Sequence, residues 1–232
     1  MTRSPRANSF LGKAVMKAIL SERFAVYAYE CIAAISTDDK HVARALDDAK
    51  EEARHARALE KAARHDRIPL FDSDVPDAQM SELRAAFTRL FDAGDRIACI
   101  YAQDILLEQV AIHLYEALLV GARNGSAPVL ASLVEQILVD ERSHVASAVE
   151  EIRSEVGFVE RSRGLAVATA TLMPVIAKYG AKKPGAPCAS VCSTCRGRCC
   201  KLDAKAVDLP LKGGTLRLVR AVKSTLSQIE AA

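Results

Sequence analysis

The chain of 232 residues contains no tryptophan, and phenylalanine and tyrosine together make up only 5% of it. Glycine and proline, the residues that most often interrupt regular structure, are scarce before residue 180. Alanine and leucine are abundant instead, and both are strong helix formers. Such a composition favours long helices. The sequence therefore predicts an all-α protein.

The chain also lacks any block of charge of one sign. Its formal net charge is +3, and basic and acidic residues are interspersed, which excludes the basic patch of a nucleic-acid-binding protein. No apolar run approaches the roughly 20 residues of a membrane span. Residues 1–10 carry Arg and Ser, but no long apolar stretch of a signal peptide follows them. We therefore expect a cytoplasmic protein with no membrane span and no nucleic-acid partner.

Cysteine is rare over most of the chain, because five of the seven lie within one short window. Cys31 and Cys99 fall in helical segments and are expected in the core. Five thiols so close together in a cytosolic-looking chain indicate metal binding before disulfides. Their spacing fits neither common ferredoxin pattern, whereas zinc tolerates many spacings. An iron–sulfur or iron–thiolate centre, a structural zinc, and disulfides or free thiols stay open. The candidate ligands are Cys188, Cys192, Cys195, Cys199 and Cys200.

Apolar periodicity predicts a series of long helices. The expected ranges are 9–36, 39–65, 77–121, 127–156 and 158–179, and a last helix is expected at about 215–230. Asp38 is the expected N-cap of the second helix, whose charged residues should mostly form a solvated face. Gly94 is a possible break in the third, and Pro128 fits the first turn of the fourth.

Two connections divide the chain. Residues 67–76 contain two prolines and form a long link, as expected for a crossover to the other end of a bundle. Residues 182–187 are a linker by composition. We therefore expect a helical bundle with an extra packed helix over residues 9–180, followed by a Cys-rich metal-binding appendage over residues 181–232.

The sequence Glu-x-x-His occurs twice, as Glu52 to His55 and as Glu141 to His144. Three residues is about one helical turn, so the Glu and the His of each copy share a helix face. Two such helices are typical of di-iron carboxylate bundles, which need one further Glu from each of two other helices. The candidates for these are Glu22 or Glu30 and Glu108 or Glu116.

The position of each candidate along its predicted hairpin separates them. Glu52 lies about 14 residues after its turn, and Glu22 lies about 16 residues before the same turn, so the two should be level. Glu141 and Glu108 are matched in the same way. An error of eight residues, as for Glu30, displaces a carboxylate by about 12 Å along the axis. We therefore expect Glu22 and Glu108, and not Glu30 or Glu116, as ligands.

The two halves repeat one further residue. Tyr29 follows Glu22 by seven residues, and Tyr115 follows Glu108 by the same interval. Seven residues is close to two turns, so each Tyr should share the face of its Glu. We interpret both as candidates for a role in catalysis, as hydrogen-bond donors to the ligands or radical relays, with an ordinary place in the core as the alternative.

The expected ligand set suits iron. Carboxylates with a few imidazoles form a hard oxygen and nitrogen environment, in which two iron ions, or manganese, fit. Glu22 with His55 is expected to hold one metal, and Glu108 with His144 the other. Glu52 and Glu141 would bridge the two. The remaining histidines, His41, His65 and His113, have no carboxylate at ligand spacing and are expected at the surface or in the core.

With these residues, about residues 10–156 resemble the ferritin-like di-iron carboxylate superfamily. The segment from Cys99 to Tyr115 is similar to the third helix of the aldehyde-deformylating oxygenases, which use a di-iron centre, dioxygen and external electrons to convert a fatty aldehyde to an alkane and formate. The resemblance implies a ferritin-like four-helix bundle. The Cys-rich tail departs from that pattern, and Cys192 to Cys200 resembles a small family of Cys-rich domains described as zinc- or iron-chelating.

The expected function is therefore that of a non-haem di-iron oxygenase or oxidase. It would activate dioxygen to oxidise a small or apolar organic substrate. The Cys-rich tail would relay electrons, and an electron-donor protein and a homodimer are compatible with this reading. A rubrerythrin-like peroxidase acting on peroxide, a ferroxidase or iron-handling protein, and a helical binding module remain alternatives.

Overall fold

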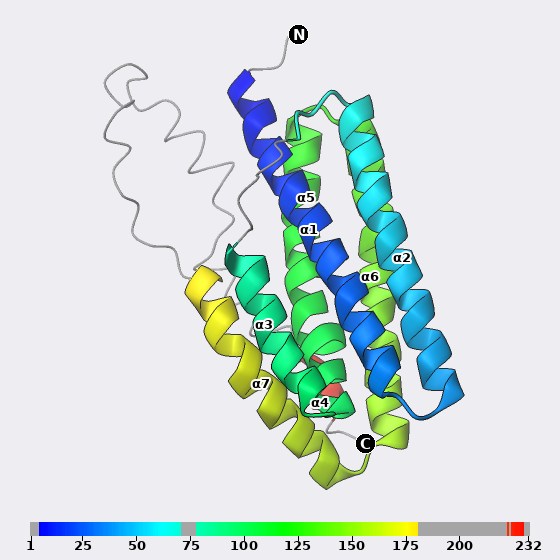
Figure 1. The fold of residues 1–232 in the computed structure, drawn as a ribbon. Helices are drawn as coiled ribbons and strands as arrows, with labels where there is room; N and C mark the ends of the chain where they lie inside the picture. Colours follow the sequence, from blue (N-terminus) through cyan, green and yellow to red (C-terminus); the bar gives the residue numbers. More distant parts are fainter. Residues whose placement is uncertain (1–4, 71–77, 181–221, 223, 230–232) are drawn as a thin grey trace.

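The computed structural model describes residues 5–70, 78–180, 222 and 224–229, and every regular element in these ranges is a helix (Figure 1). The predicted all-α class is therefore confirmed. The elements are α1 (Pro5–Ile35), α2 (Asp39–His65), α3 (Ala78–Asp92), α4 (Arg96–Ile100), the π-helix η1 (Tyr101–Leu107), α5 (Glu108–Asn124), α6 (Pro128–Glu155) and α7 (Phe158–Gly180).

Helices α1 and α2 form an antiparallel hairpin with the bounds that periodicity predicted to within a few residues. Asp38 caps α2, because its side chain accepts hydrogen bonds from the backbone N–H groups of Lys40 (2.8 Å) and His41 (3.4 Å). These bonds satisfy two of the donors that a helix start leaves unpaired. The cap thereby fixes the level at which α2 begins, and with it the level of every residue on α2 relative to α1.

A second hairpin is formed by α5 and α6, with Pro128 in the first turn of α6 as expected. The two hairpins pack through contacts of α1 with α5 and of α2 with α6 (Figure 1). At one end, the carboxylate of Asp66, which ends α2, accepts a hydrogen bond from the backbone N–H of Leu130 (2.8 Å). This buried bond joins the end of one hairpin to the start of the other.

The predicted third helix is several elements. Helix α3 ends at Asp92, and Gly94 has a φ of +66°, a left-handed conformation that glycine adopts without strain. The break that the sequence indicated near Gly94 is thus confirmed. The π-helix was not predicted, because a periodicity argument assumes one helical pitch throughout. In it, the backbone N–H of Glu108 bonds to the carbonyl of Gln103, five residues earlier.

Helix α7 packs against α3, α4 and η1. Gly164 allows the close approach, since a Cβ there would lie 2.6 Å from Cγ2 of Ile97. A short helical segment near the C-terminus returns to this region. The Gln109 side chain donates to Thr225 (3.3 Å), and Arg161 donates to the carbonyl of Ile229 (3.0 Å).

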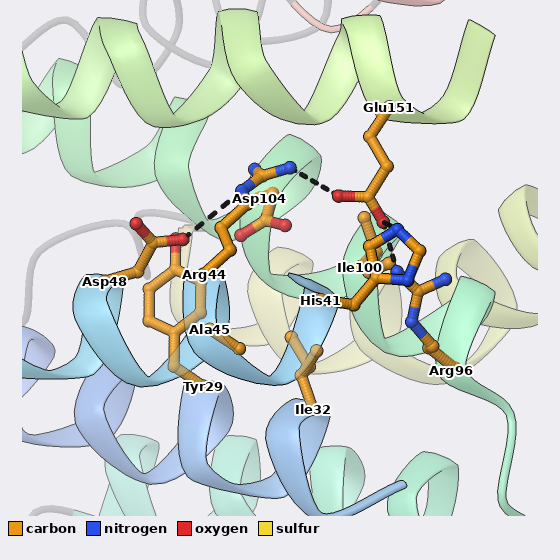
Figure 2. Close-up of a pocket in the computed structure, with 10 residues that line it drawn as sticks. All are labelled: Tyr29, Ile32, His41, Arg44, Ala45, Asp48, Arg96, Ile100, Asp104 and Glu151. Atoms are coloured by element: carbon orange, nitrogen blue, oxygen red, sulfur yellow. Dashed lines mark hydrogen bonds and ion pairs between the residues drawn. The ribbon is translucent and has the colours of Figure 1, made fainter. Parts of the chain in front are cut away.

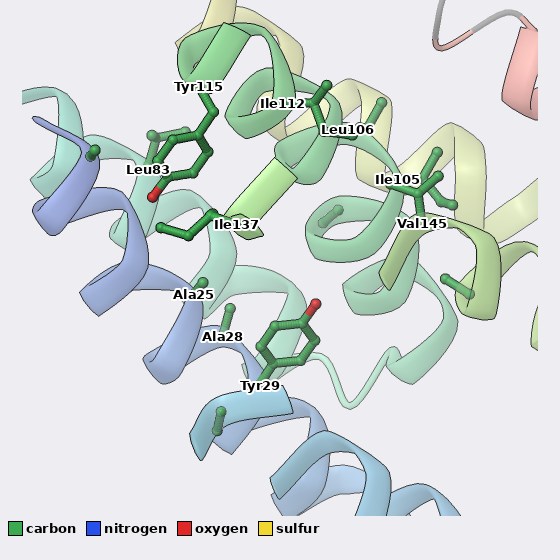
Figure 3. Close-up of a cluster of buried hydrophobic side chains, with 14 of the residues drawn as sticks. Ala25, Ala28, Tyr29, Leu83, Ile105, Leu106, Ile112, Tyr115, Ile137 and Val145 are labelled. Carbon is green, nitrogen blue, oxygen red and sulfur yellow. The ribbon is translucent and has the colours of Figure 1, made fainter. Parts of the chain in front are cut away.

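The core runs between the helices and includes Cys31 and Cys99, which are buried as expected. Figure 3 shows Tyr29 on α1 and Tyr115 on α5 among the buried side chains of this core. Both tyrosines are almost inaccessible to solvent, with exposed fractions of 1% and 0%. A phenol buried this deeply needs a hydrogen-bond partner for its hydroxyl group.

The continuous stretch Arg96–Asn124, made of α4, η1 and α5, is long and apolar enough to cross a membrane by length and composition. Asp104 and Glu108 interrupt what would otherwise be a long apolar run. The stretch packs against α1, α6 and α7. Buried core helices of soluble proteins have the same composition.

Two features that the sequence indicated lie outside the described residues. One is the Cys-rich segment, with Cys188, Cys192, Cys195, Cys199 and Cys200. The other is most of the connection predicted at residues 67–76.

Candidate metal centre

Six acidic and imidazole side chains meet between the two hairpins, one or two from each of four helices. None is more than 5% exposed. They are Glu22 on α1, Glu52 and His55 on α2, Glu108 on α5, and Glu141 and His144 on α6. These are the six residues that the spacing and depth arguments selected. By contrast, Glu30 and Glu116 are exposed and belong to neither group of potential ligands, and Glu116 pairs with Arg142 at the surface (3.1 Å).

The six side chains form two overlapping groups of potential metal ligands. One group is Glu22, Glu52, His55 and Glu141, and the other is Glu52, Glu108, Glu141 and His144. Within each group the ligand atoms lie within 4.8 Å of one another. Glu52 and Glu141 belong to both groups. This is the arrangement expected if these two carboxylates bridge a pair of metal ions.

The histidines present Nδ1 to the carboxylates. His55 Nδ1 lies 3.5 Å from Glu22 Oε2 and 3.4 Å from Glu52 Oε2. His144 Nδ1 lies 3.2 Å from Glu52 Oε1. A neutral imidazole that presents one nitrogen to a group of carboxylate oxygens is a suitable ligand for a divalent transition metal.

Several of these buried polar atoms have no hydrogen-bond partner among the described residues. They are Glu22 Oε2, Glu52 Oε1, both Glu141 carboxylate oxygens, His55 Nδ1 and His144 Nδ1. Buried carboxylates without partners cost several kcal/mol each, so they are rarely left in this state. The unpaired atoms converge from four helices on one volume. The donor set therefore fits a pair of metal ions.

The pKa values show how the cluster carries its charge without a metal. Burial raises the pKa values of Glu22, Glu108 and Glu141. Burial alone would also raise the pKa of Glu52, but Glu22 and the two histidines beside it lower it. Burial alone would lower the pKa of His144, but the nearby carboxylates raise it to about 10. Bound protons thus offset part of the negative charge, and metal ions bound here would displace them.

The two tyrosines donate hydrogen bonds across the hairpins. The hydroxyl of Tyr29 on α1 donates to Oε1 of Glu108 on α5 (3.0 Å), and the hydroxyl of Tyr115 on α5 donates to Oε1 of Glu22 on α1. Each tyrosine was expected on the face of the Glu in its own helix, and each in fact holds the Glu of the other hairpin. A catalytic role for either remains a prediction.

The π-helix adds a donor to only one of these carboxylates. Gln103 lies five residues before Glu108, and its side-chain amide donates to Oε1 of Glu108 (2.8 Å). Oε1 of Glu108 therefore accepts two hydrogen bonds, one from Gln103 and one from Tyr29. Spacing alone did not indicate Gln103, because in a regular α-helix a residue five positions away points to a different face.

The outer nitrogen of each histidine contacts an acid from the opposite hairpin. His55 Nε2 lies 3.1 Å from Asp140, and His144 Nε2 lies 3.3 Å from Glu51. A hydrogen bond at Nε2 fixes the tautomer in which Nδ1 is free to bind a metal. Neither acid was predicted, and Glu51 was assigned to a solvated face. The signal was present in the sequence, since an acid directly precedes Glu-x-x-His in both copies.

The other histidines lie elsewhere. His41 was expected to have no carboxylate at ligand spacing, but α6 provides Glu155 (2.5 Å) and Glu151 (3.7 Å). That contact joins residues 114 positions apart, so local spacing could not reveal it. His65 is exposed, and His113 bonds to the backbone carbonyl of Gln109 on its own helix (2.8 Å).

A small pocket is lined by Tyr29 and, for the most part, by charged side chains, and none of the six residues lines it (Figure 2). Asp104, on the π-helix, forms part of its wall and is only 4% exposed. Burial raises the pKa of Asp104 to about 8, although Arg44 and Tyr29 oppose this effect. Nothing in the sequence pattern singled out Asp104, because its burial depends on the π-helix and on the packing of that helix against α1, α6 and α7.

No protein-family model matches the sequence, and a search of curated proteins finds none with significant similarity. Any statement about function therefore depends on the residues and geometry described above.

Proposed function

We propose that this protein is a di-iron oxidoreductase that activates dioxygen to oxidise a small or apolar organic substrate. Its scaffold would be a ferritin-like four-helix bundle of α1, α2, α5 and α6, with α7 as the extra packed helix and the Cys-rich appendage beyond it. The observation that supports this best is the pair of overlapping, fully buried ligand groups that share Glu52 and Glu141.

Charge favours two divalent ions over one. Four carboxylates balance the four positive charges of two divalent ions, and the two neutral histidines complete the set. Glu22 and His55 would hold one iron, Glu108 and His144 the other, and Glu52 and Glu141 both. Two iron ions bound there would supply the electrons that reduce dioxygen and the oxidising power that is then applied to the substrate. Manganese fits the same donors and is the alternative metal.

The protein side chains would control the geometry of these ligands. Tyr29 and Gln103 hold Oε1 of Glu108, and Tyr115 holds Oε1 of Glu22, so one oxygen of each terminal carboxylate is fixed. Asp140 and Glu51 orient the two histidines. Among the described residues, neither oxygen of Glu141 has a hydrogen-bond partner, so this carboxylate would be free to adjust to bound metal ions.

The apolar surroundings support a reaction from which bulk water is excluded. Ile112 lies one turn from Glu108 and is 7% exposed, and the core side chains around Tyr115 are equally buried (Figure 3). Such an environment strengthens electrostatic interactions and protects reactive species from side reactions. It suits an oxygenase or oxidase with an apolar substrate, and a peroxidase would also be protected in this way.

We propose that the Cys-rich tail supplies electrons to this site, directly or from an electron-donor protein. The short helical segment that follows the tail is bonded through Thr225 to Gln109, the residue next to Glu108. Iron and acid-labile sulfide should therefore be found in anaerobically purified protein in excess of the two bundle irons. Zinc alone in the tail would contradict an electron-relay role, because zinc has no redox chemistry.

The test of the function has two steps. First, iron is counted in the wild type, Glu108→Ala and the matched control Glu116→Ala; we expect two bundle irons in the wild type, fewer in Glu108→Ala and no loss in Glu116→Ala. Equal iron in the two variants would contradict the ligand assignment. Second, the reduced protein is mixed with dioxygen or with peroxide. If the reduced protein consumes dioxygen faster than peroxide, the result supports an oxygenase or oxidase. If it turns over peroxide faster, the result supports a rubrerythrin-like peroxidase. If the protein forms a large cage that accumulates iron, the result supports a ferroxidase.

A further inference from the structure

The outer faces of α5 and α6 carry the same short pattern of exposed residues. On each helix a Glu is followed by a Val four residues later and by an Arg three residues after that. The residues are Glu116, Val120 and Arg123 on α5, and Glu135, Val139 and Arg142 on α6. Residues at intervals of four and three lie on one face of an α-helix, so each set forms a stripe along its helix.

The two stripes pair with each other within the chain. Helices α5 and α6 lie side by side and run antiparallel, so the Glu of each stripe is opposite the Arg of the other (Figure 1). Glu116 pairs with Arg142 (3.1 Å), and Glu135 pairs with Arg123. All four side chains stay about half exposed. Because exposed ion pairs contribute little to stability, the fold itself gains little from this arrangement.

The two valines lie between these ion pairs. Val120 and Val139 are at about the same level, because each follows the Glu of its stripe by four residues and precedes the Arg by three. Their exposed fractions are 57% and 64%. Single exposed hydrophobic residues are common on soluble proteins. Two that lie together and are framed by charged pairs give an apolar centre with a polar rim, as in a protein–protein contact.

The pairing of the stripes within the chain identifies the partner that fits this face. Each stripe is complementary to any antiparallel copy of its own pattern, and a second copy of the chain provides two such stripes. Two copies can meet face to face about a two-fold axis that runs along or across the helices. In both cases each helix lies antiparallel to the helix that it faces, so opposite charges meet at both ends and the valines meet at the centre.

We propose that the two stripes form an isologous surface through which two copies of the chain associate as a dimer. Helix α5 has 17 residues, so the face is about 25 Å long, and two helices side by side are about 20 Å wide. Such a face buries about 500 Å² per copy, or about 1,000 Å² in total, which is near the lower limit for a specific interface. The dimer is therefore weak and dissociates on dilution into the micromolar range.

The dimer does not require bound metal. The stripes are exposed on the outside of the hairpin, whereas the six candidate ligands are buried between the two hairpins. Metal-free and iron-loaded protein should therefore associate alike. This independence allows the dimer and the metal centre to be tested separately.

Sedimentation velocity of the full chain over a range of concentrations measures the association. The wild type should change from monomer to dimer as its concentration rises. Val120→Glu puts a carboxylate from each copy into the apolar centre, so it should weaken the dimer about 100-fold or more. Leu46→Glu, at a position on α2 that is 40% exposed and lies outside this face, is the matched control and should associate as the wild type does.

Exchange of the charges separates loss of this contact from loss of folding. Glu116→Lys with Glu135→Lys makes both stripes positive, and Arg123→Glu with Arg142→Glu makes both negative. Each variant alone should stay monomeric, because like charges then face each other. An equimolar mixture of the two should form a dimer with one copy of each, which misfolded protein could not do.

A change of net charge elsewhere should have no such effect. Glu30→Lys with Asp47→Lys changes the net charge by the same amount as the positive variant, at exposed positions on α1 and α2. This control should associate as the wild type does. Circular dichroism of every variant compares the helix content.

The dimer surface is wrong if the wild type stays monomeric at every concentration or forms only assemblies larger than a dimer. It is equally wrong if Val120→Glu associates as the wild type does, or if Leu46→Glu or the charge control dissociates as fully as Val120→Glu. A mixture of the positive and negative variants that stays monomeric also contradicts it. The iron count is a separate measurement, so failure of the dimer leaves the proposed function standing.

Discussion

The hairpin of α1 and α2 and the hairpin of α5 and α6 contribute matching side chains to the site but differ in the structure that supports them. Each provides a Glu, a Tyr seven residues later, and an acid followed by Glu-x-x-His. In the first hairpin the Glu and Tyr lie on an unbroken α-helix, whereas in the second a π-helix precedes Glu108 and adds Gln103 and Asp104. The comparison indicates that the ligands are nearly symmetric and that the side chains supporting them are not.

The contacts between these hairpins are crossed. Tyr29 and Tyr115 each bond to a Glu of the opposite hairpin, and the two histidines contact acids of the opposite hairpin. Neither hairpin could therefore form a complete half-site by itself. Metal binding should require both, and it should stabilise their packing against each other.

The largest effect should come from the carboxylates that both halves share. Glu141→Ala removes a ligand from both groups, so we expect loss of nearly all iron from the bundle. Glu22→Ala removes a ligand from one group only, and roughly half of the iron should remain at saturating concentration. Metal analysis after desalting measures both. A smaller loss in Glu141→Ala than in Glu22→Ala would show that Glu141 does not bridge.

The next largest effect should be the dependence of stability on pH. Because the folded-state pKa values of Glu22, Glu108 and Glu141 are raised, these groups stabilise the metal-free protein most below their ordinary pKa of 4.5 and progressively less as the pH rises. The raised pKa of His144, about 10, acts in the same direction above pH 6.5. Metal-free protein should therefore become less stable between pH 6 and pH 9.

Iron should offset this loss of stability. Metal displaces protons from these groups, so the stabilisation by iron should increase with pH, by about 1.4 kcal/mol per pH unit for each proton released. Denaturant unfolding at a series of pH values, with and without ferrous iron under anaerobic conditions, measures this difference. A difference that is independent of pH would argue against proton displacement at the cluster.

Asp140 and Glu51 contact the Nε2 atoms of the two histidines, and replacing either should have a smaller effect on iron binding. The effect should be equal for the two residues if the two halves of the site are equivalent. Loss of such a partner typically lowers metal affinity about 10- to 100-fold, so Asp140→Asn and Glu51→Gln should each weaken iron binding by that amount. Competition with a chelator measures the affinity. Asp47→Asn, at an exposed position of α2, is the control and should bind as the wild type does.

The smallest effect should come from the tyrosine hydroxyls in the metal-free protein. Tyr29→Phe and Tyr115→Phe each leave a buried carboxylate oxygen with one donor fewer, and each should lower the free energy of unfolding by about 1 kcal/mol. Glu108 retains the bond from Gln103, so Tyr29→Phe should be the milder variant. Thermal unfolding compares them, and a larger loss in Tyr29→Phe would contradict this order.

The sequence alone determined most of the helices and the six residues that they bring together. Helix periodicity fixed the face on which each Glu and His lies, and the turns at residue 38 and near residue 124 fixed their level along the bundle. Both are local properties of the chain. That is why Glu22 and Glu108 could be separated from Glu30 and Glu116. Whether these residues bind iron is a matter for the experiments above.

The tertiary structure alone decided how these residues are supported. The crossed bonds of Tyr29 and Tyr115 and the contact of His41 with α6 join residues far apart in the sequence, so they depend on which helix packs beside which. The π-helix changes the pitch over seven residues, and only this change places Gln103 on Glu108. Helical periodicity assumes a constant pitch and carries no information about which helices pack side by side. For that physical reason the candidate ligands were predictable from the sequence, and their asymmetric hydrogen-bond partners were not.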